Sequence, residues 1–297
     1  MGFSMLDSGA CAGMARCTPA QAASTFEYLD RFVRFDTDLK LRVSAVFSRC
    51  CLATHPDFGL EPAAAAAEAA TLAQAVLDHP DRDGLDLDPL LLVTCYALLA
   101  DEGVEVSRVS DLVTEIARRL GTLGADVRLV GRIRHITSLL AARGFEASID
   151  APAKEMLQLT REPGKLLNAS GEVVADFADH LFADQTALDE DLTVMLALIS
   201  LGELRNYRVD LGAKLLRLCV AQGRPCEEAG EGLNFVALQR RRSGAYGFLN
   251  PFLPAEERNE NLDEAFFLPM TLNAVWLLRI EAASRSRSLG STEGHGS

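Results

Sequence analysis

The sequence has few aromatic residues, and this scarcity argues against a β fold. Phe, Trp and Tyr make up 6 % of the 297 residues, whereas strands recruit aromatic and β-branched side chains. No segment alternates cleanly between apolar and polar residues over six positions, as a half-buried strand would. Because Ala and Leu dominate and both favour helices, the sequence predicts an all-α protein with essentially no sheet.

Basic residues are outnumbered by acidic ones, and this argues against binding partners that are themselves negatively charged. The formal net charge is −13, and an acidic surface repels both a phosphate backbone and an anionic membrane. We therefore expect no nucleic-acid partner. No uninterrupted run of 18 apolar residues occurs and no positively charged, then apolar, leader opens the chain, so we expect neither a membrane span nor a signal peptide.

The cysteines and histidines do not form a metal-binding pattern. Seven cysteines occur at irregular spacing, which suits a reduced, cytoplasmic protein better than a disulfide framework. No histidine stands at zinc-ligand spacing from a cysteine pair, and no Asp-Asp-x-x-Asp motif or glycine-rich phosphate loop is present. Asp176, Asp179 and Asp184 are either Mg²⁺ ligands or a solvated acidic face. We expect no cofactor and no metal.

Composition divides the chain into three parts. Residues 1–20 and 284–297 are small, polar and aperiodic, so we expect two disordered ends. Residues 21–283 show helical periodicity almost throughout and are expected to form a single α-helical domain.

Strongly apolar helices recur along this domain, with amphipathic helices between them. They are centred near residues 95, 196 and 273, with weaker examples near 46 and 136, and 210–220 is an amphipathic segment. A helix that is apolar on every face is normally buried, whereas an amphipathic helix turns one face to solvent. The pattern favours helical hairpins in two layers, either closed as an α/α toroid or stacked as an irregular helical array.

One segment near the C-terminus resembles a known repeat. A predicted helix ends at Gln239, Gly244-Ala245-Tyr246-Gly247 follows, and an apolar helix begins near Thr271. This order resembles one repeat of the squalene-cyclase and prenyltransferase toroids, in which a Gly-aromatic-Gly turn joins an outer helix to an inner one. The resemblance covers mainly residues 232–280, and Ser243 stands where the family has an acidic residue. It implies a toroid of the terpene-cyclase type.

A second segment resembles the acid motif of the class II terpene cyclases, Asp-x-Asp-Asp-Thr. Asp189-Glu190-Asp191-Leu192-Thr193 matches it except at Leu192. The resemblance implies that Asp191 is a general acid that protonates an alkene, with Asp189 and Tyr246 as further catalytic residues. The alternative is that these acids cap a helix and face the positive end of its dipole.

Three functions are open at this point. The first is a biosynthetic enzyme, a cyclase that acts on an apolar small molecule by acid–base chemistry in a cavity between helices. The residues expected to bind its substrate are Trp276, Asn250, Asn273 and Arg241. The second is a non-catalytic helical module that binds a peptide or protein or assembles with one. The third is a domain whose cavity is completed by a partner subunit or a second copy, which would make the protein a homo-oligomer.

Overall fold

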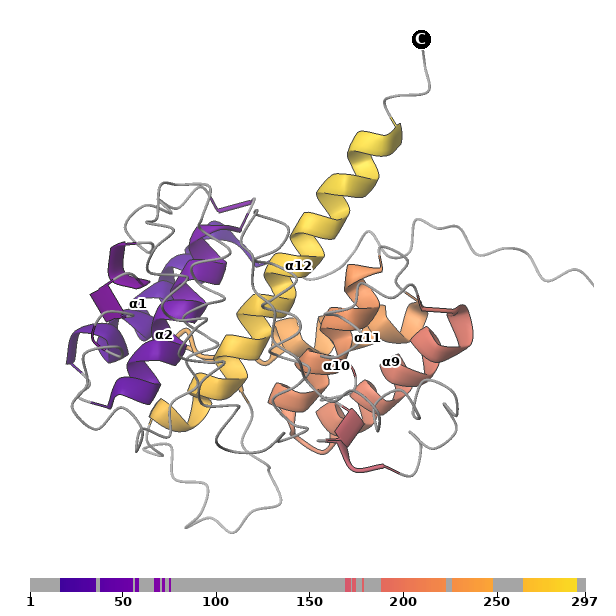
Figure 1. The fold of residues 1–297 in the computed structure, drawn as a ribbon, viewed down its shortest axis with the longest axis horizontal. Coiled ribbons are helices and arrows are strands. Elements are labelled where there is room, and N and C mark those ends of the chain that lie inside the picture. The colour runs from indigo at the N-terminus through magenta and orange to yellow at the C-terminus, as the bar shows by residue number, and fades with distance from the viewer. Residues whose placement is uncertain are drawn as a thin grey trace, which may run out of the picture.

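The protein is described by a computed structural model (Figure 1). It describes residues 17–35, 38–55, 57–58, 188–222, 226–247 and 264–292, with short stretches between 67 and 75 and between 169 and 178. The main helices are α1 (Pro19–Phe35), α2 (Leu39–Ala53), α9 (Glu190–Arg205), α10 (Val209–Ala221), α11 (Glu227–Leu238) and α12 (Leu268–Thr292), the last preceded by the 3₁₀ helix η4 (Glu264–Phe267). The described residues form no strand, and their one β-bridge joins Arg240 to Tyr246. The all-α prediction is confirmed.

Several expected features lie outside the described residues. They are the apolar helix near residue 95, the helix near 136, the cluster of Asp176, Asp179 and Asp184, and Asn250. The closure of the helices into a toroid depends on this part of the chain and stays a prediction, as does the division of the chain into domains.

Polar side chains cap the starts of α1 and α2. Thr18 and Gln21 form a reciprocal capping box at α1, in which each side chain accepts from the other residue's N–H, at 3.3 and 2.7 Å. Pro19 takes the first helical position, where its missing N–H costs nothing. Asp38 accepts from the N–H of Leu41 at the start of α2. The sequence therefore carried a start signal for α1 two residues before the expected domain boundary.

The amphipathic helix α10 is buried rather than facing solvent, which corrects the prediction for residues 210–220. It lies between α9 and α12 (Figure 1) and buries ten of its thirteen residues. Its cationic Arg217 is 3 % exposed because the guanidinium stacks on the ring of Trp276, 3.6 Å from the centroid. An arginine thus marks a packed face here and not a solvent face.

Helix α9 departs from its prediction in the opposite direction, because it is more exposed than its composition predicts. Its apolar sequence predicts a helix buried on every side, yet Leu198 is 53 % exposed and Val194 and Met195 are partly exposed. The buried side of α9 packs against α10 and α11, and Figure 1 shows α9 at the edge of the molecule. Helix α10, which its composition places in the outer layer, is therefore buried, and α9, which its composition places in the inner layer, is partly exposed.

Helix α11 begins at Glu227 and runs through Gly230 and Gly232 without a break. A Cβ on Gly232 would lie 2.9 Å from Leu216 of α10, so this glycine allows α10 and α11 to approach closely. The gain in packing outweighs the weak helix propensity of glycine, which costs about 1 kcal/mol.

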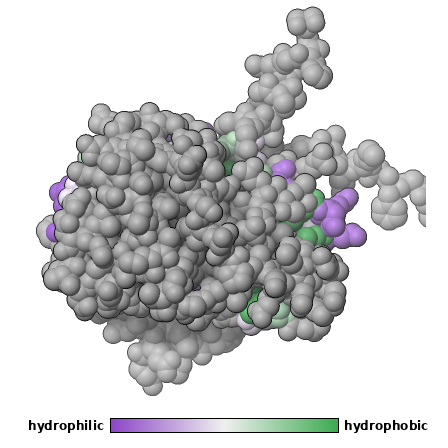
Figure 2. Space-filling model, viewed as in Figure 1, coloured by the Kyte–Doolittle hydropathy of each residue, from purple (hydrophilic) through white to green (hydrophobic). Residues whose placement is uncertain are grey.

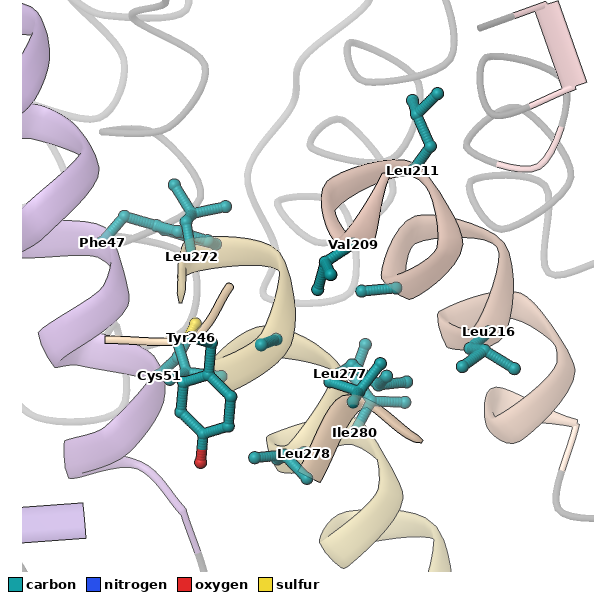
Figure 3. Packing of buried hydrophobic residues seen from close by; sticks show 14 of the residues in the cluster. Phe47, Cys51, Val209, Leu211, Leu216, Tyr246, Leu272, Leu277, Leu278 and Ile280 are labelled. Atoms are coloured by element: carbon teal, nitrogen blue, oxygen red, sulfur yellow. The ribbon is translucent and has the colours of Figure 1, made fainter. Parts of the chain in front are cut away.

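Helices α2 and α12 occupy the inner positions expected of them. Figure 3 shows Phe47 of α2 beside Leu272 of α12, and the side chains of Leu277 and Ile280 lie toward α10. Helix α12 runs to Thr292 rather than ending at Ile280. Residues 284–292, which were expected to be irregular, are therefore helical.

Candidate functional site

The turn between α11 and η4 has the sharp geometry that its glycines suggested. Gly244 has a φ of +94° and Gly247 a φ of +149°, a region of backbone space that glycine enters without a steric penalty. The N–H of Arg241 donates to the carbonyl of Ala245 at 2.8 Å, and the N–H of Gly247 donates to that of Gln239 at 3.1 Å. The turn predicted from the Gly-Ala-Tyr-Gly segment is confirmed as a local structure.

This turn also holds the N-terminal helix. The Thr25 hydroxyl of α1 donates to the Gly244 carbonyl at 2.8 Å, and Arg240 donates to the Gln21 carbonyl at 3.1 Å and to the Ser24 hydroxyl. These bonds join segments about 220 residues apart in the sequence. The turn is therefore a structural joint between the two ends of the described chain.

Tyr246 is buried in the joint. Its N–H donates to the Thr271 hydroxyl on α12 at 2.9 Å, and its phenol donates to the sulfur of Cys17, 3.7 Å away. The side chain is 1 % exposed. Burial raises the pKa of the phenol well above its usual value, so the group stays protonated at neutral pH. These contacts are those of a side chain that packs helices together.

The predicted substrate-binding side chains that the structure describes are engaged within the protein. Asn273 donates to the carbonyl of Pro269, one turn earlier on α12, at 2.9 Å. Arg241 lies over the ring of Phe267, 4.2 Å from its centroid. Trp276 is half-buried between Arg217 and Phe47, whose ring meets its own edge-on at 4.9 Å. Asn250 lies outside the described residues.

The two acids of the cyclase-like motif lie at the start of α9. Asp189 is the N-cap, and its carboxylate accepts from the N–H of Leu192 at 2.7 Å. Asp191 follows in the first turn with an exposed side chain. The capping alternative is confirmed for Asp189, and Asp191 has the position of an acid that faces the helix dipole.

The structure does not bring these acids together with Tyr246. The start of α9 lies beside the end of α10, since Cys219 donates to the carbonyl of Thr193. The end of α10 lies beside Ser284 of α12, which donates to Val220. Tyr246 instead bonds to Thr271, and the turns from Thr271 to Ser284 span about 20 Å. The predicted catalytic residues thus stand at opposite ends of the helical layer.

Replacing Asp189 with alanine should lower the free energy of unfolding by about 1 kcal/mol, because the first turn of α9 loses its cap. Replacing Asp191 with asparagine should cost only a few tenths of a kcal/mol, the size of a helix-dipole contact at the surface. Urea unfolding of the two variants measures the difference. Equal losses would contradict the assignment of Asp189 as the cap.

Two buried thiols, those of Cys51 and Cys219, are poor nucleophiles. Burial raises the pKa of both Cys51 and Cys219 to about 12, so each stays a protonated thiol at neutral pH and behaves as a small apolar side chain. No group of three or more His, Cys, Asp or Glu side chains among the described residues is arranged to hold a metal ion.

A polar corner joins the end of α2 to α12. The guanidinium of Arg279 donates to the Thr54 hydroxyl at 2.6 Å, and that of Arg285 donates to Asp57 at 3.1 Å. Between these bonds His55 is 6 % exposed and stacks on Phe58 with ring centroids 3.8 Å apart. Its Nδ1 accepts from the N–H of Asp57 at 3.2 Å. Burial lowers the pKa of His55 from 6.5 to about 4.

This depressed pKa predicts a loss of stability in mild acid. Between pH 6.5 and about 4 the unfolded chain binds a proton at His55 that the folded chain does not, so the free energy of unfolding falls as the pH is lowered. The full effect approaches about 3 kcal/mol. A His55→Gln variant should lose this part of the pH dependence in urea titrations at a series of pH values. An identical slope in both proteins would contradict the prediction.

One described helix resembles a membrane span by length and composition. It is Ala265–Arg285, and 61 % of its most apolar stretch is buried inside the protein. Its place between α2 and α10 accounts for that composition.

No model of a protein family, no curated protein and no solved structure matches the chain. The resemblance to terpene-cyclase toroids therefore rests on the residues quoted for it and stays an expectation.

Proposed function

We propose that this chain is a non-catalytic helical module that binds a protein partner through the outward face of α9. The exposure of Leu198 carries the proposal, because it leaves an apolar side chain half in water on a helix that is apolar on most sides. Figure 2 shows hydrophobic residues beside strongly hydrophilic ones on the side of the molecule where Figure 1 places α9. Covering such a face would contribute about 25 cal/mol per Å² of apolar surface removed from water.

The contacts that polar side chains make within the protein support the same proposal. Among the described residues expected to act on a substrate, Asp189 caps a helix, Tyr246 and Asn273 bond within the core, and Trp276 packs under Arg217. A site for acid–base chemistry needs titratable groups that converge on one position. These groups are spread over both ends of the helical layer.

The cyclase hypothesis stays open as a prediction and makes a distinct demand on Asp191. If Asp191 is a general acid, Asp191→Asn should abolish turnover of a polyene substrate and leave the thermal unfolding temperature nearly unchanged. Equal turnover in the variant and in the unaltered protein would end that hypothesis. The turn at Gly244-Ala245-Tyr246-Gly247 is the local feature that favours it.

Site-specific photocrosslinking tests the proposed function. A photoreactive amino acid placed at Leu198 in cells should give a defined crosslinked species, identified by mass spectrometry. The same group at Ala23, which is exposed on α1, should not give that species. The proposal fails if Leu198 yields no adduct or if both positions yield the same adducts.

A further inference from the structure

We infer that the outward face of α9 binds a partner helix that is amphipathic and basic. This inference rests on the proposed function and specifies the chemistry of its partner. It follows from three features of the face, which are its shape, its open glycine and the sign of the charges around it.

The exposed side of α9 forms one straight stripe. Its members stand three or four positions apart, which places them on one side of a helix, and they are Asp191, Met195, Leu198, Gly202 and Arg205. Met195 is half-buried against the core, and the other four are exposed. The stripe is apolar in the middle and charged at both ends. It spans about 21 Å along the axis, the length of four helical turns. A partner helix that presents apolar residues at the same spacing would match it along its whole length.

Gly202 leaves the backbone of α9 uncovered within this stripe, because glycine has no side chain. No atom lies within 4 Å of the position that a Cβ on Gly202 would take, so packing within the chain does not require glycine there. In a helix interior, glycine is about 1 kcal/mol less favourable than alanine. The bare backbone beside Leu198 lets a neighbouring helix come closer than an ordinary side chain would allow.

The charges around the stripe determine which helix fits. Helices α9 and α11 together carry six acidic side chains and one basic one, and Glu203 among these acids is paired at 3.4 Å with Arg208, which follows α9. The basic one, Arg205, is paired with Glu231 of α11 at 3.0 Å. Glu190, Asp191 and Glu227 are exposed. A partner with lysine or arginine on both sides of its apolar stripe would meet opposite charges.

A second copy of this chain fits the face less well. Two copies packed through α9 would bring the same acidic side chains together, and each copy carries a net charge of −13. Like charges opposed across an interface cost several kcal/mol. The described residues also contain no strand whose edge could be extended, so docking of an extended peptide by strand addition is not available in this part of the chain.

Binding of designed peptides tests the inference. Two amphipathic Leu-rich peptides of about 18 residues, long enough to form helices, would carry either Lys or Glu on the polar face. Fluorescence anisotropy should show binding of the Lys peptide, with the dissociation constant rising about tenfold between low and high salt. The Glu peptide should not bind. Leu198→Asp should weaken binding of the Lys peptide by at least about tenfold.

Matched variants give the experiment its controls. Phe266→Asp alters another exposed apolar side chain, 49 % accessible, in η4, which packs against α12, and should leave peptide binding unchanged. Glu190→Gln combined with Asp191→Asn should reduce the salt dependence while keeping most of the affinity. Unfolding curves of every variant check that the fold is intact.

The outcomes separate this inference from the proposed function. Equal binding of the Lys and Glu peptides, lost in Leu198→Asp, would overturn the basic partner and leave a docking face on α9. Leu198-dependent dimers in light scattering would replace the basic helix with a second copy and overturn the inference. Failure of both peptides to bind, with a Leu198 crosslink still formed in cells, would overturn the inference alone. Failure of the crosslink as well would end the proposed function.

Discussion

Replacing Gly244 with alanine should lower the free energy of unfolding by about 3 kcal/mol or more. Gly244 has a φ of +94°, which strains any residue with a Cβ by about 1–3 kcal/mol. The added Cβ would also overlap the backbone carbonyl of Ser24 and lie 2.8 Å from the backbone nitrogen of Thr25. Backbone atoms cannot rotate away, so α1 must shift and its bond from Thr25 to the Gly244 carbonyl is weakened.

Gly202→Ala is the matched control for this substitution. It adds the same methyl group in a helix, where nothing lies within 4 Å of the new atom, and should raise the free energy of unfolding by about 0.5–1 kcal/mol. Urea unfolding compares the two variants, and limited proteolysis reports whether α1 has been released. A Gly244→Ala protein as stable as the unaltered chain would show that the turn does not hold α1.

Replacing Tyr246 with alanine should lower the free energy of unfolding by about 3–5 kcal/mol, the cost of a large cavity in a core. Tyr246 is among the largest fully buried side chains and belongs to the buried cluster drawn in Figure 3. Tyr246→Phe should cost less than about 1 kcal/mol, because the partner of its phenol among the described residues is the weak acceptor sulfur of Cys17.

The pair of variants distinguishes a packing role from a catalytic one. If Tyr246 packs helices, Tyr246→Phe keeps stability and every binding property of the protein. If the phenol acts on a substrate, Tyr246→Phe loses turnover while keeping the same unfolding curve. Urea unfolding measures the first quantity, and the second follows once a substrate is in hand. A Tyr246→Ala protein with unaltered stability would contradict the packing role.

Several local features of the fold could be predicted from short stretches of sequence. The N-cap at Asp189, the glycine turn at 244–247 and the apolar helices α2 and α12 all appear as expected. Each depends on neighbouring residues alone, through a capping carboxylate, a backbone conformation open to glycine or a run of apolar side chains. Such signals need no knowledge of what packs against them.

The layer of each helix could not be predicted in the same way. Helix α10 is amphipathic and yet buried, because Arg217 stacks on Trp276, a residue of α12 far along the chain. Helix α9 is apolar on most sides and yet exposes Leu198 at the edge of the described helices. An arginine facing a tryptophan and an arginine facing water look alike in the sequence, so this choice depends on tertiary neighbours.

The positions of the predicted catalytic residues relative to one another could not be predicted from the sequence either. The sequence analysis grouped Asp191 and Tyr246 as catalytic residues because the resemblance to terpene cyclases implied both. Their separation depends on the antiparallel pairing of α9 with α10 and on the register of α10 against α12, set by contacts such as Ser284 with Val220. Register between helices arises from interlocking side chains, which neither segment encodes by itself.

By itself, the sequence determined that the chain is helical, where several helices begin and turn, and that the surface is acidic. Local propensity, capping and charge act over a few residues, so one segment suffices to specify them. Only the tertiary structure decided which helix is enclosed, which polar side chains are used for packing, and that α9 presents an apolar stripe among acids. Those properties belong to pairs of segments, and a free energy shared between two surfaces cannot be assigned to either alone.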